Sequence, residues 1–145
     1  MSDIGMGAVV AWSLGTPIAS WPSFLMLLIS SSCVYLAGMV LNDVADVDVD
    51  RSERGFRPIP SGRISRNAAL IIGVILLGLG LSSSALVRLE GSRPLMTCCV
   101  LVLAVVAYDF SPFNWLRLVL MPTCRFLNVL LGMSAADLAV LPWNV

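Results

Sequence analysis

Residues 42–62 carry most of the groups in this chain that could do chemistry. The segment reads NDVADVDVDRSERGFRPIPSG and holds five acidic residues and three arginines, although only 12% of the whole chain is charged. If the apolar segment before it continues as a helix, four oxygen-bearing side chains share one face within about 100°: Asn42, Asp43, Asp46 and Asp50. Asp48 falls on the opposite side of the same helix.

These four side chains, called the acidic cluster below, would repel one another unless a cation lay among them. Oxygen ligands of this kind favour Mg²⁺ or Ca²⁺. The guanidinium groups of Arg51, Arg54 and Arg57 follow directly and are suited to phosphate oxygens. Because Mg²⁺ is usually held by one or two carboxylates together with substrate phosphates, the pattern indicates a phosphate-bearing ligand bridged through metal.

The same residues allow two other interpretations. In the first, the segment is a solvated loop in which acids and arginines simply pair. The one-face spacing, and the stiffening by Pro58, Pro60 and Gly62, favour a binding site instead. The second is an EF-hand calcium loop, which is excluded because Arg51 stands at its glycine position and Arg57 at its glutamate position.

The composition limits the chemistry further. The 145 residues are 58% hydrophobic, with a net charge of zero and no histidine; every basic residue is an arginine. Nothing therefore indicates a nucleic-acid surface, and catalysis has to rest on carboxylates, arginines, amides and hydroxyls. The four cysteines lie inside apolar segments, which fits small buried side chains better than disulfides or a zinc site.

Long uncharged segments predict an all-α fold, a polytopic transmembrane helical bundle. Residues 4–42 and 67–87 carry no charge, and a membrane span needs about 20 apolar residues. Prolines and glycines divide the chain into five expected helices, over about 4–16, from 22 to the acidic cluster, and over about 66–89, 94–108 and 114–136. Gly73, Gly78 and Gly80 would let the third helix pack closely against others. We treat residues 1–145 as a single transmembrane domain.

The arginines predict the orientation of the bundle. The loop at about 43–66 carries more than half of them, namely Arg51, Arg54, Arg57, Arg63 and Arg66. Arg117 falls on the same side in an alternating topology, and Arg88 and Arg93 on the other. The positive-inside rule then places the acidic loop in the cytoplasm.

The spacing ND-x-x-D-x-x-x-D followed by RPIPSG resembles the first aspartate-rich motif of the UbiA-type membrane prenyltransferases. The similarity covers NDVADVDVDRSERGFRPIPSGRIS. Tyr108 resembles the tyrosine near the family's second cytoplasmic loop, and CRFLNVLLGMS (124–134) resembles the fifth helix of the EboC-like branch. A lysine common near that tyrosine is absent. The chain is expected to correspond to roughly the N-terminal half of a nine-helix fold, with the second aspartate-rich motif beyond Val145.

The resemblance implies Mg²⁺-dependent transfer of a prenyl group from a prenyl diphosphate to an acceptor, commonly aromatic, within the membrane. It implies that the acidic cluster holds Mg²⁺ and the diphosphate, with catalytic roles for Asp46, Asp50 and Arg57. Substrate contacts would come from Asn42, Asp43, Arg57, Arg63 and Tyr108. The alternative is a non-catalytic or truncated membrane protein that binds polyprenyl phosphates, or an assembly partner in lipid or metabolite export.

Two polar residues inside the last apolar segment are further substrate-binding candidates. An ionisable residue within a membrane span is a functional hypothesis by default, so Arg125 is expected to face the substrate cavity and meet phosphate or Asp109. The alternative is that it snorkels toward the interface. Asn128 would line the same cavity, or else join two helices by hydrogen bonds.

Overall fold

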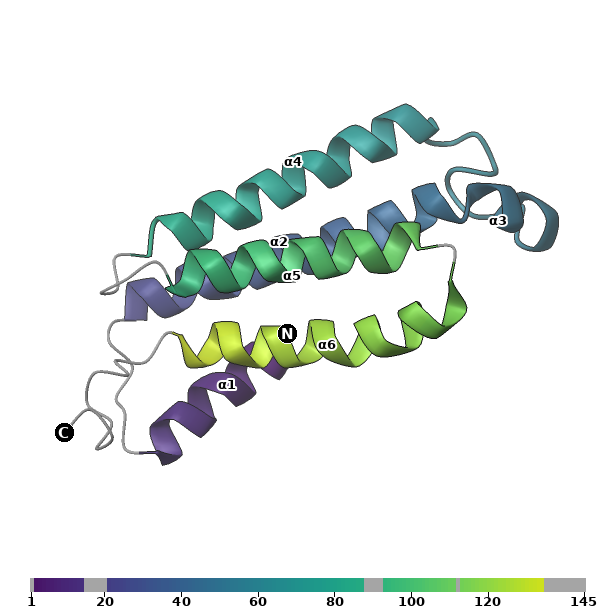
Figure 1. Ribbon diagram of the computed structural model, residues 1–145. Coiled ribbons are helices and arrows are strands. Elements are labelled where there is room, and N and C mark those ends of the chain that lie inside the picture. Colours follow the sequence, from purple (N-terminus) through teal and green to yellow (C-terminus); the bar gives the residue numbers. More distant parts are fainter. Residues whose placement is uncertain (1, 15–20, 88–92, 112, 135–145) are drawn as a thin grey trace.

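The fold is a bundle of helices in a computed structural model that describes residues 2–14, 21–87, 93–111 and 113–134 (Figure 1). Within these ranges there are six helices and no strand: α1 (Ser2–Ser13), α2 (Trp21–Ala45), α3 (Val47–Glu53), α4 (Arg66–Ala85), α5 (Arg93–Phe110) and α6 (Asn114–Met133). The all-α bundle predicted from the sequence is confirmed. The expected helix ends at positions 16, 89 and 136, and Arg88, lie outside the described residues.

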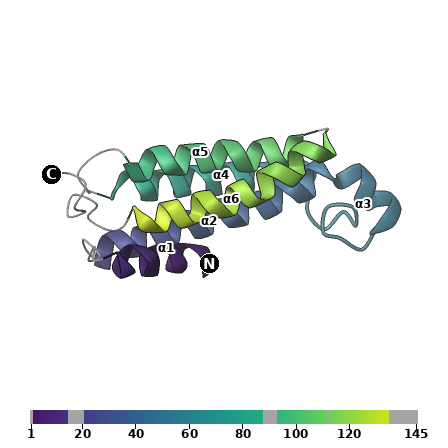
Figure 2. The ribbon, with the colours of Figure 1, turned by 60° about the horizontal axis from the view of Figure 1, so that its bottom comes forward.

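The expected five helices become six because the second one breaks at Asp46. This residue has φ −90° and ψ 8°, which separates α2 from the short α3. The helical hydrogen bonds nevertheless bridge the break, since the Asp46 amide donates to the Asn42 carbonyl and the Asp50 amide to the Asp46 carbonyl, both at 2.9 Å. The acidic cluster thus lies on one nearly continuous helical path, and α3 projects beyond the end of the bundle (Figure 2).

Helices α2 and α4 pack tightly because α4 presents small residues to α2. A Cβ atom added to Gly80 would lie 2.8 Å from Val34, and one added to Gly73 would lie 2.8 Å from Leu41. The Ser30 hydroxyl also donates to the Gly80 carbonyl at 2.7 Å. The predicted close packing of this helix is therefore confirmed for Gly73 and Gly80, whereas a Cβ at Gly78 would meet nothing within 4 Å.

Helix α1 lies along α6 on the other side of the bundle (Figures 1 and 2). A Cβ atom on Gly132 would collide with the Ile4 carbonyl, and one on Gly7 would collide with the Val129 carbonyl. Ile4 and Leu131 are both fully buried at this contact. Glycine is needed at these two positions because the two backbones touch.

The outside of the bundle is apolar, as expected for helices surrounded by lipid. Large side chains such as Leu118, Leu103 and Trp12 are 69–77% exposed. Four helices are long and apolar enough to cross a membrane: α2, α4, α5 and the Trp115–Met133 part of α6. This is the composition of an integral membrane protein.

Candidate functional site

The acidic cluster is held in shape by Arg57, which reaches back from the loop after α3. Its Nη1 atom donates to Asp50 Oδ2 at 2.7 Å and to Asp43 Oδ1 at 2.9 Å. The side chain of Asp50 is only 5% exposed. Because charged hydrogen bonds of this length are strong, Arg57 fixes two of the four predicted ligands.

The RPIPSG segment explains why Arg57 can turn back toward the helix it follows. The Arg57 amide donates to the Arg54 carbonyl at 3.0 Å and the Ser61 amide to the Arg57 carbonyl at 2.9 Å. Gly62 then adopts φ 76°, a left-handed conformation that other residues rarely take. Ser65 caps the N-terminus of α4 by accepting a hydrogen bond from the Ala68 amide at 3.2 Å. The turn sequence thus sets the position of Arg57.

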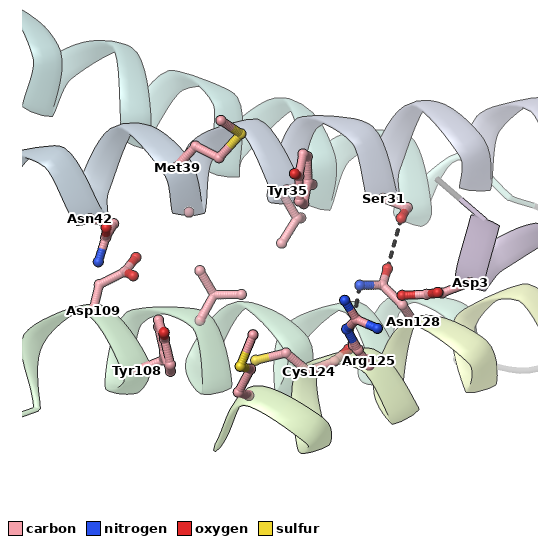
Figure 3. Close-up of a pocket in the computed structure, with 14 residues that line it drawn as sticks. Asp3, Ser31, Tyr35, Met39, Asn42, Tyr108, Asp109, Cys124, Arg125 and Asn128 are labelled. Carbon is pink, nitrogen blue, oxygen red and sulfur yellow. Dashed lines mark hydrogen bonds between the residues drawn. The ribbon is translucent and has the colours of Figure 1, made fainter. Parts of the chain in front are cut away.

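A second arginine approaches the acidic cluster from the start of α6. Arg117 Nη2 lies 3.8 Å from Asp46 Oδ1 and donates to the backbone carbonyl of Asp109 at 3.2 Å. Asp109 lies at the end of α5 with only 2% of its surface exposed. Its carboxylate points toward the side-chain amide of Asn42 (Figure 3).

Two atoms at this place have no hydrogen-bond partner among the described residues, Asp109 Oδ2 and Arg117 Nε, although both are buried. One is an acceptor and the other a donor. Buried polar groups are normally paired, so the pair is suited to a ligand that brings both a cation and anionic oxygens. A magnesium–phosphate group has both.

The donor set at the acidic cluster fits Mg²⁺ carried by a phosphate better than Mg²⁺ held by protein alone. Within the described ranges, no three acidic, cysteine or histidine side chains lie close enough together to hold a metal. Asp43 and Asp50 are turned to Arg57, and Asp46 to Arg117. Since Mg²⁺ is usually bound by one or two carboxylates plus substrate phosphates, such an arrangement is compatible with the ion.

A cleft of about 540 Å³ leads from this place into the bundle between α2, α5 and α6. Its volume is within the range of small-molecule sites, about 300–1,000 Å³. It is lined by Asp3, Ser31, Val34, Tyr35, Gly38, Met39, Asn42, Val105, Tyr108, Asp109, Met121, Cys124, Arg125 and Asn128. Figure 3 shows two polar ends. We call them the acidic end, with Asn42, Tyr108 and Asp109, and the arginine end, with Arg125, Asn128 and Asp3.

At the arginine end, Asn128 joins two helices. Its side-chain oxygen accepts a hydrogen bond from the Ser31 hydroxyl of α2 at 2.7 Å, and its amide donates to the Cys124 carbonyl at 3.4 Å. This geometry agrees with the role of helix connector that the sequence left open for Asn128. Its contact with substrate stays a prediction.

Arg125 lies near the middle of the Trp115–Met133 span, far from either end of the helix. The contact with Asp109 that the sequence suggested is not formed: the two residues lie at opposite ends of the cleft (Figure 3). An arginine at the centre of a membrane helix makes the free energy of membrane insertion less favourable by about 2.5–3.5 kcal/mol. A functional role of Arg125 in the cleft would explain why it is present.

The remaining predicted residues divide into two groups. Tyr108 and Asn42 line the cleft beside the acidic cluster. Arg63 is exposed in the loop before α4 and lines no part of the cleft. Asp48, predicted to point away, has a side chain that is 78% exposed and lies 3.8 Å from Arg51, so this prediction is confirmed.

Sequence reasoning did not assign a site role to Asp109 or Arg117. The rule that marked Arg125, a charge inside an apolar segment, also applies to Asp109 and would have identified it. The sequence pattern used Arg117 only to predict the orientation of the bundle in the membrane. Its approach to Asp46 depends on how the start of α6 lies relative to the end of α2, which spacing along the chain does not contain.

The chain is similar in sequence to several known proteins. The chain is 38% identical over 80 residues to a digeranylgeranylglyceryl phosphate synthase of Sulfolobus acidocaldarius, which covers 52% of this chain and 29% of that protein. A synthase of the same name from Methanoregula boonei is 36% identical over 75% of this chain and 39% of the relative. A 2-acylphloroglucinol 4-prenyltransferase of Humulus lupulus is 33% identical over 83% of this chain and 29% of the relative.

The matched region therefore spans about a third of the length of these curated relatives. No solved structure matches significantly. The model of the UbiA prenyltransferase family matches residues 4–144, almost the whole chain. The chain belongs to the UbiA prenyltransferase family.

Proposed function

We propose that the acidic cluster binds the diphosphate of a prenyl diphosphate through Mg²⁺, and that the cleft receives an acceptor to which the prenyl group is transferred. The observation that carries this proposal is the gathering of carboxylates and two arginines around Asn42 and Asp109, which line one end of the cleft. Asp43 and Asp50 meet Arg57, and Asp46 lies near Arg117. Membership of the family and the names of its relatives support prenyl transfer as the reaction class.

Several residues of the acidic cluster would together bind the diphosphate leaving group. When bound, Mg²⁺ would neutralise the diphosphate and stabilise the charge that develops as the allylic C–O bond breaks. Asn42, Asp43, Asp46 and Asp50 would hold the ion. Arg57 donates to two carboxylates in this structure, and we propose that it turns its remaining N–H donors to diphosphate oxygens.

The walls of the cleft would protect the reacting carbon from water. Between its polar ends the cleft presents mainly Val34, Met39, Val105 and Met121. An apolar cavity keeps water from a carbon that develops positive charge. Tyr108 lies at the acidic end (Figure 3), where its ring and hydroxyl are placed to contact the head of the prenyl diphosphate. Arg63, exposed in the loop, would contact diphosphate only after the loop moves.

We also propose that the loop between α2 and α4 faces the cytoplasm, because it carries most of the arginines and cytoplasmic loops carry an excess of basic residues. A cysteine introduced at Ser52, which is exposed in α3, would then react with an impermeant maleimide only in inverted membrane vesicles. Labelling from the periplasmic or outer side would reverse the assignment.

The site assignment is tested by comparing Asp46→Ala with Asp48→Ala. The two aspartates are neighbours in sequence, but Asp48 is on the exposed face. The measurement is the binding of a non-hydrolysable geranylgeranyl thiolodiphosphate to the chain in nanodiscs, with Mg²⁺ and with EDTA. Because even residues that support metal ligands contribute about 10–100-fold in affinity, Asp46→Ala is expected to lose at least tenfold, and Asp48→Ala almost nothing. Binding that needs neither Mg²⁺ nor Asp46 would refute the assignment.

A second candidate function is binding of polyprenyl phosphates without transfer. It is favoured by one observation, that the acidic side chains are paired with arginines and no three of those described are grouped for a metal. The same titration separates the two candidates. Tight binding of the thiolodiphosphate that is unchanged by EDTA favours the binding protein, whereas Mg²⁺-dependent binding favours the prenyltransferase site.

A further inference from the structure

Arg125 places a charged guanidinium in the cleft, and this group takes no part in the proposed diphosphate site. It makes no hydrogen bond or ion pair within 4.0 Å to another described residue, whereas Arg57 and Arg117 each make two contacts at the acidic end. It borders the same cleft, with Asn128 one helical turn further along α6 (Figure 3). Charges inside membrane helices usually serve a ligand or pathway.

Arg125 is too far from the acidic cluster to hold the same ligand group. The hydrogen bond between Ser31 and Asn128 places these two residues at one level of the bundle. Asn42 lies about three helical turns, or about 16 Å, from Ser31 along α2, and Arg125 recovers only about 4 Å of this distance. The two arginine-containing ends of the cleft therefore address different chemical groups.

The chemistry of the arginine end selects an anion. A guanidinium binds carboxylate or phosphate through two parallel hydrogen bonds. Arg125 is exposed in the described bundle, so its guanidinium is accessible to such a group. We propose, as an extension of the proposed function, that Arg125 binds a carboxylate or phosphate group of the acceptor. The acceptor would then lie along the cleft with its nucleophilic atom toward Tyr108 and Asn42.

Asp3 offers a competing explanation, since its carboxylate lies beside Arg125 at the same end of the cleft (Figure 3). Arg125 would then only help to hold α1 against α6. This contact is already made by two glycines, Gly7 and Gly132, and by the buried Ile4. The two explanations differ in what removal of the Asp3 charge does. An anion site is unchanged or strengthened by it, and a helix tether is lost.

The test uses the full chain in phosphatidylcholine nanodiscs and three fluorescent probes: 6-hydroxy-2-naphthoate, its methyl ester, and 2-naphthyl phosphate. Fluorescence titration gives the preference for each anion over the neutral ester. The variants are Arg125→Gln, Arg125→Lys and Asp3→Asn. Mg²⁺-dependent binding of geranylgeranyl thiolodiphosphate is measured on every sample, which reports on folding and on the proposed function independently.

We expect the wild-type chain to bind at least one of the two anions about tenfold more tightly than the ester, a difference within reach of one charged hydrogen-bonded contact. Arg125→Gln should abolish this preference, Arg125→Lys should keep part of it, and Asp3→Asn should keep or raise it. A carboxylate-selective or a phosphate-selective result identifies which group the acceptor carries. Diphosphate binding should be equal in all four proteins.

Other results overturn the proposal. Equal binding of ester and anions by the wild type, or an unchanged preference in Arg125→Gln, excludes the anion site. Equal losses in Asp3→Asn and Arg125→Gln show a helix tether. Displacement of both anions by phosphatidic acid, added to the nanodiscs at a few per cent, shows a lipid-headgroup site instead. Failure of thiolodiphosphate binding with the anion preference intact would refute the proposed function and leave the anion site standing.

Discussion

The two ends of the central cleft differ in whether their arginines are paired with aspartates. Next to the acidic end lies the acidic cluster, where each of two arginines lies near an aspartate: Arg57 bridges Asp43 and Asp50, and Arg117 lies 3.8 Å from Asp46. At the arginine end, Arg125 has no ion pair within 4.0 Å among the described residues. Internal contacts thus pair the arginines beside the first end, whereas at the second end the internal hydrogen bonds hold Asn128 but not Arg125.

The difference shows how polar groups are tolerated inside an apolar bundle. Paired charges need no ligand to remain in place, but breaking one pair leaves the other charge exposed to low dielectric. Arg125 is exposed in the described bundle, so its substitution leaves no buried charge unpaired. We therefore expect mutations at the acidic end to affect both stability and binding, and mutations of Arg125 to affect mainly binding.

The largest effect on stability is expected from Arg57→Gln. This change removes the hydrogen bonds to Asp43 and to Asp50, whose side chain is 5% exposed. Hydrogen bonds to charged groups contribute about 1.5–3 kcal/mol, so the free energy of unfolding should fall by about 2 kcal/mol. Unfolding in mixed micelles with increasing dodecyl sulfate, followed by circular dichroism, measures the change.

Arg51→Gln is the matched control for this prediction. Arg51 lies 3.8 Å from Asp48, but both side chains are more than two-thirds exposed, and exposed pairs contribute little. The control should unfold like the wild type. Equal destabilisation by the two substitutions would mean that the acidic end is not held by Arg57.

An effect on stability of similar size is expected from Gly132→Ala, which acts on the arginine end through α1. The added methyl group would collide with the Ile4 carbonyl. Overpacking of this kind costs about 1–3 kcal/mol. Because α1 carries Asp3 to the arginine end, anion binding there should change while Mg²⁺-dependent diphosphate binding is kept.

Gly78→Ala is the control for the second prediction, since a Cβ at Gly78 meets nothing within 4 Å. Glycine inside a helix is about 0.5–1 kcal/mol less favourable than alanine, so this variant should be as stable as the wild type or slightly more stable. If Gly132→Ala also unfolds like the wild type, the backbones of α1 and α6 do not touch.

Individual residues at both ends of the cleft were predictable from the sequence, Asn42 and Tyr108 at one end and Arg125 and Asn128 at the other, but most of their partners were not. Spacing along one helix placed Asp43, Asp46 and Asp50 on one path and turned Asp48 away, as the structure has them. The break at Asp46 and the return of Arg57 were not predictable, because they depend on contacts made by a loop 14 residues further along the chain.

Contacts between residues on different helices cannot be predicted from the spacing of residues along the sequence. Asp109 meets Asn42 only because the end of α5 lies beside α2, and Asn128 meets Ser31 across 97 positions. The sequence marked Arg125 as a charge inside an apolar segment, with phosphate or Asp109 as its suggested partner. The fold separates these two residues by the length of the cleft (Figure 3). The sequence pattern identified the polar side chains of the cleft, and the packing of the helices determined which of them contact each other.

The smallest effect is expected from the hydrogen bond between Ser31 and Asn128, which joins α2 to α6 at 2.7 Å. A double-mutant cycle with Ser31→Ala and Asn128→Ala should give a coupling energy of about 0.6 kcal/mol, and no more than about 1.7 kcal/mol, as for other hydrogen bonds between membrane helices. If Asn128 only joins helices, the two single variants should lower acceptor binding equally, because each removes the same bond. A loss confined to Asn128→Ala would instead make its amide part of the binding site, next to the guanidinium of Arg125.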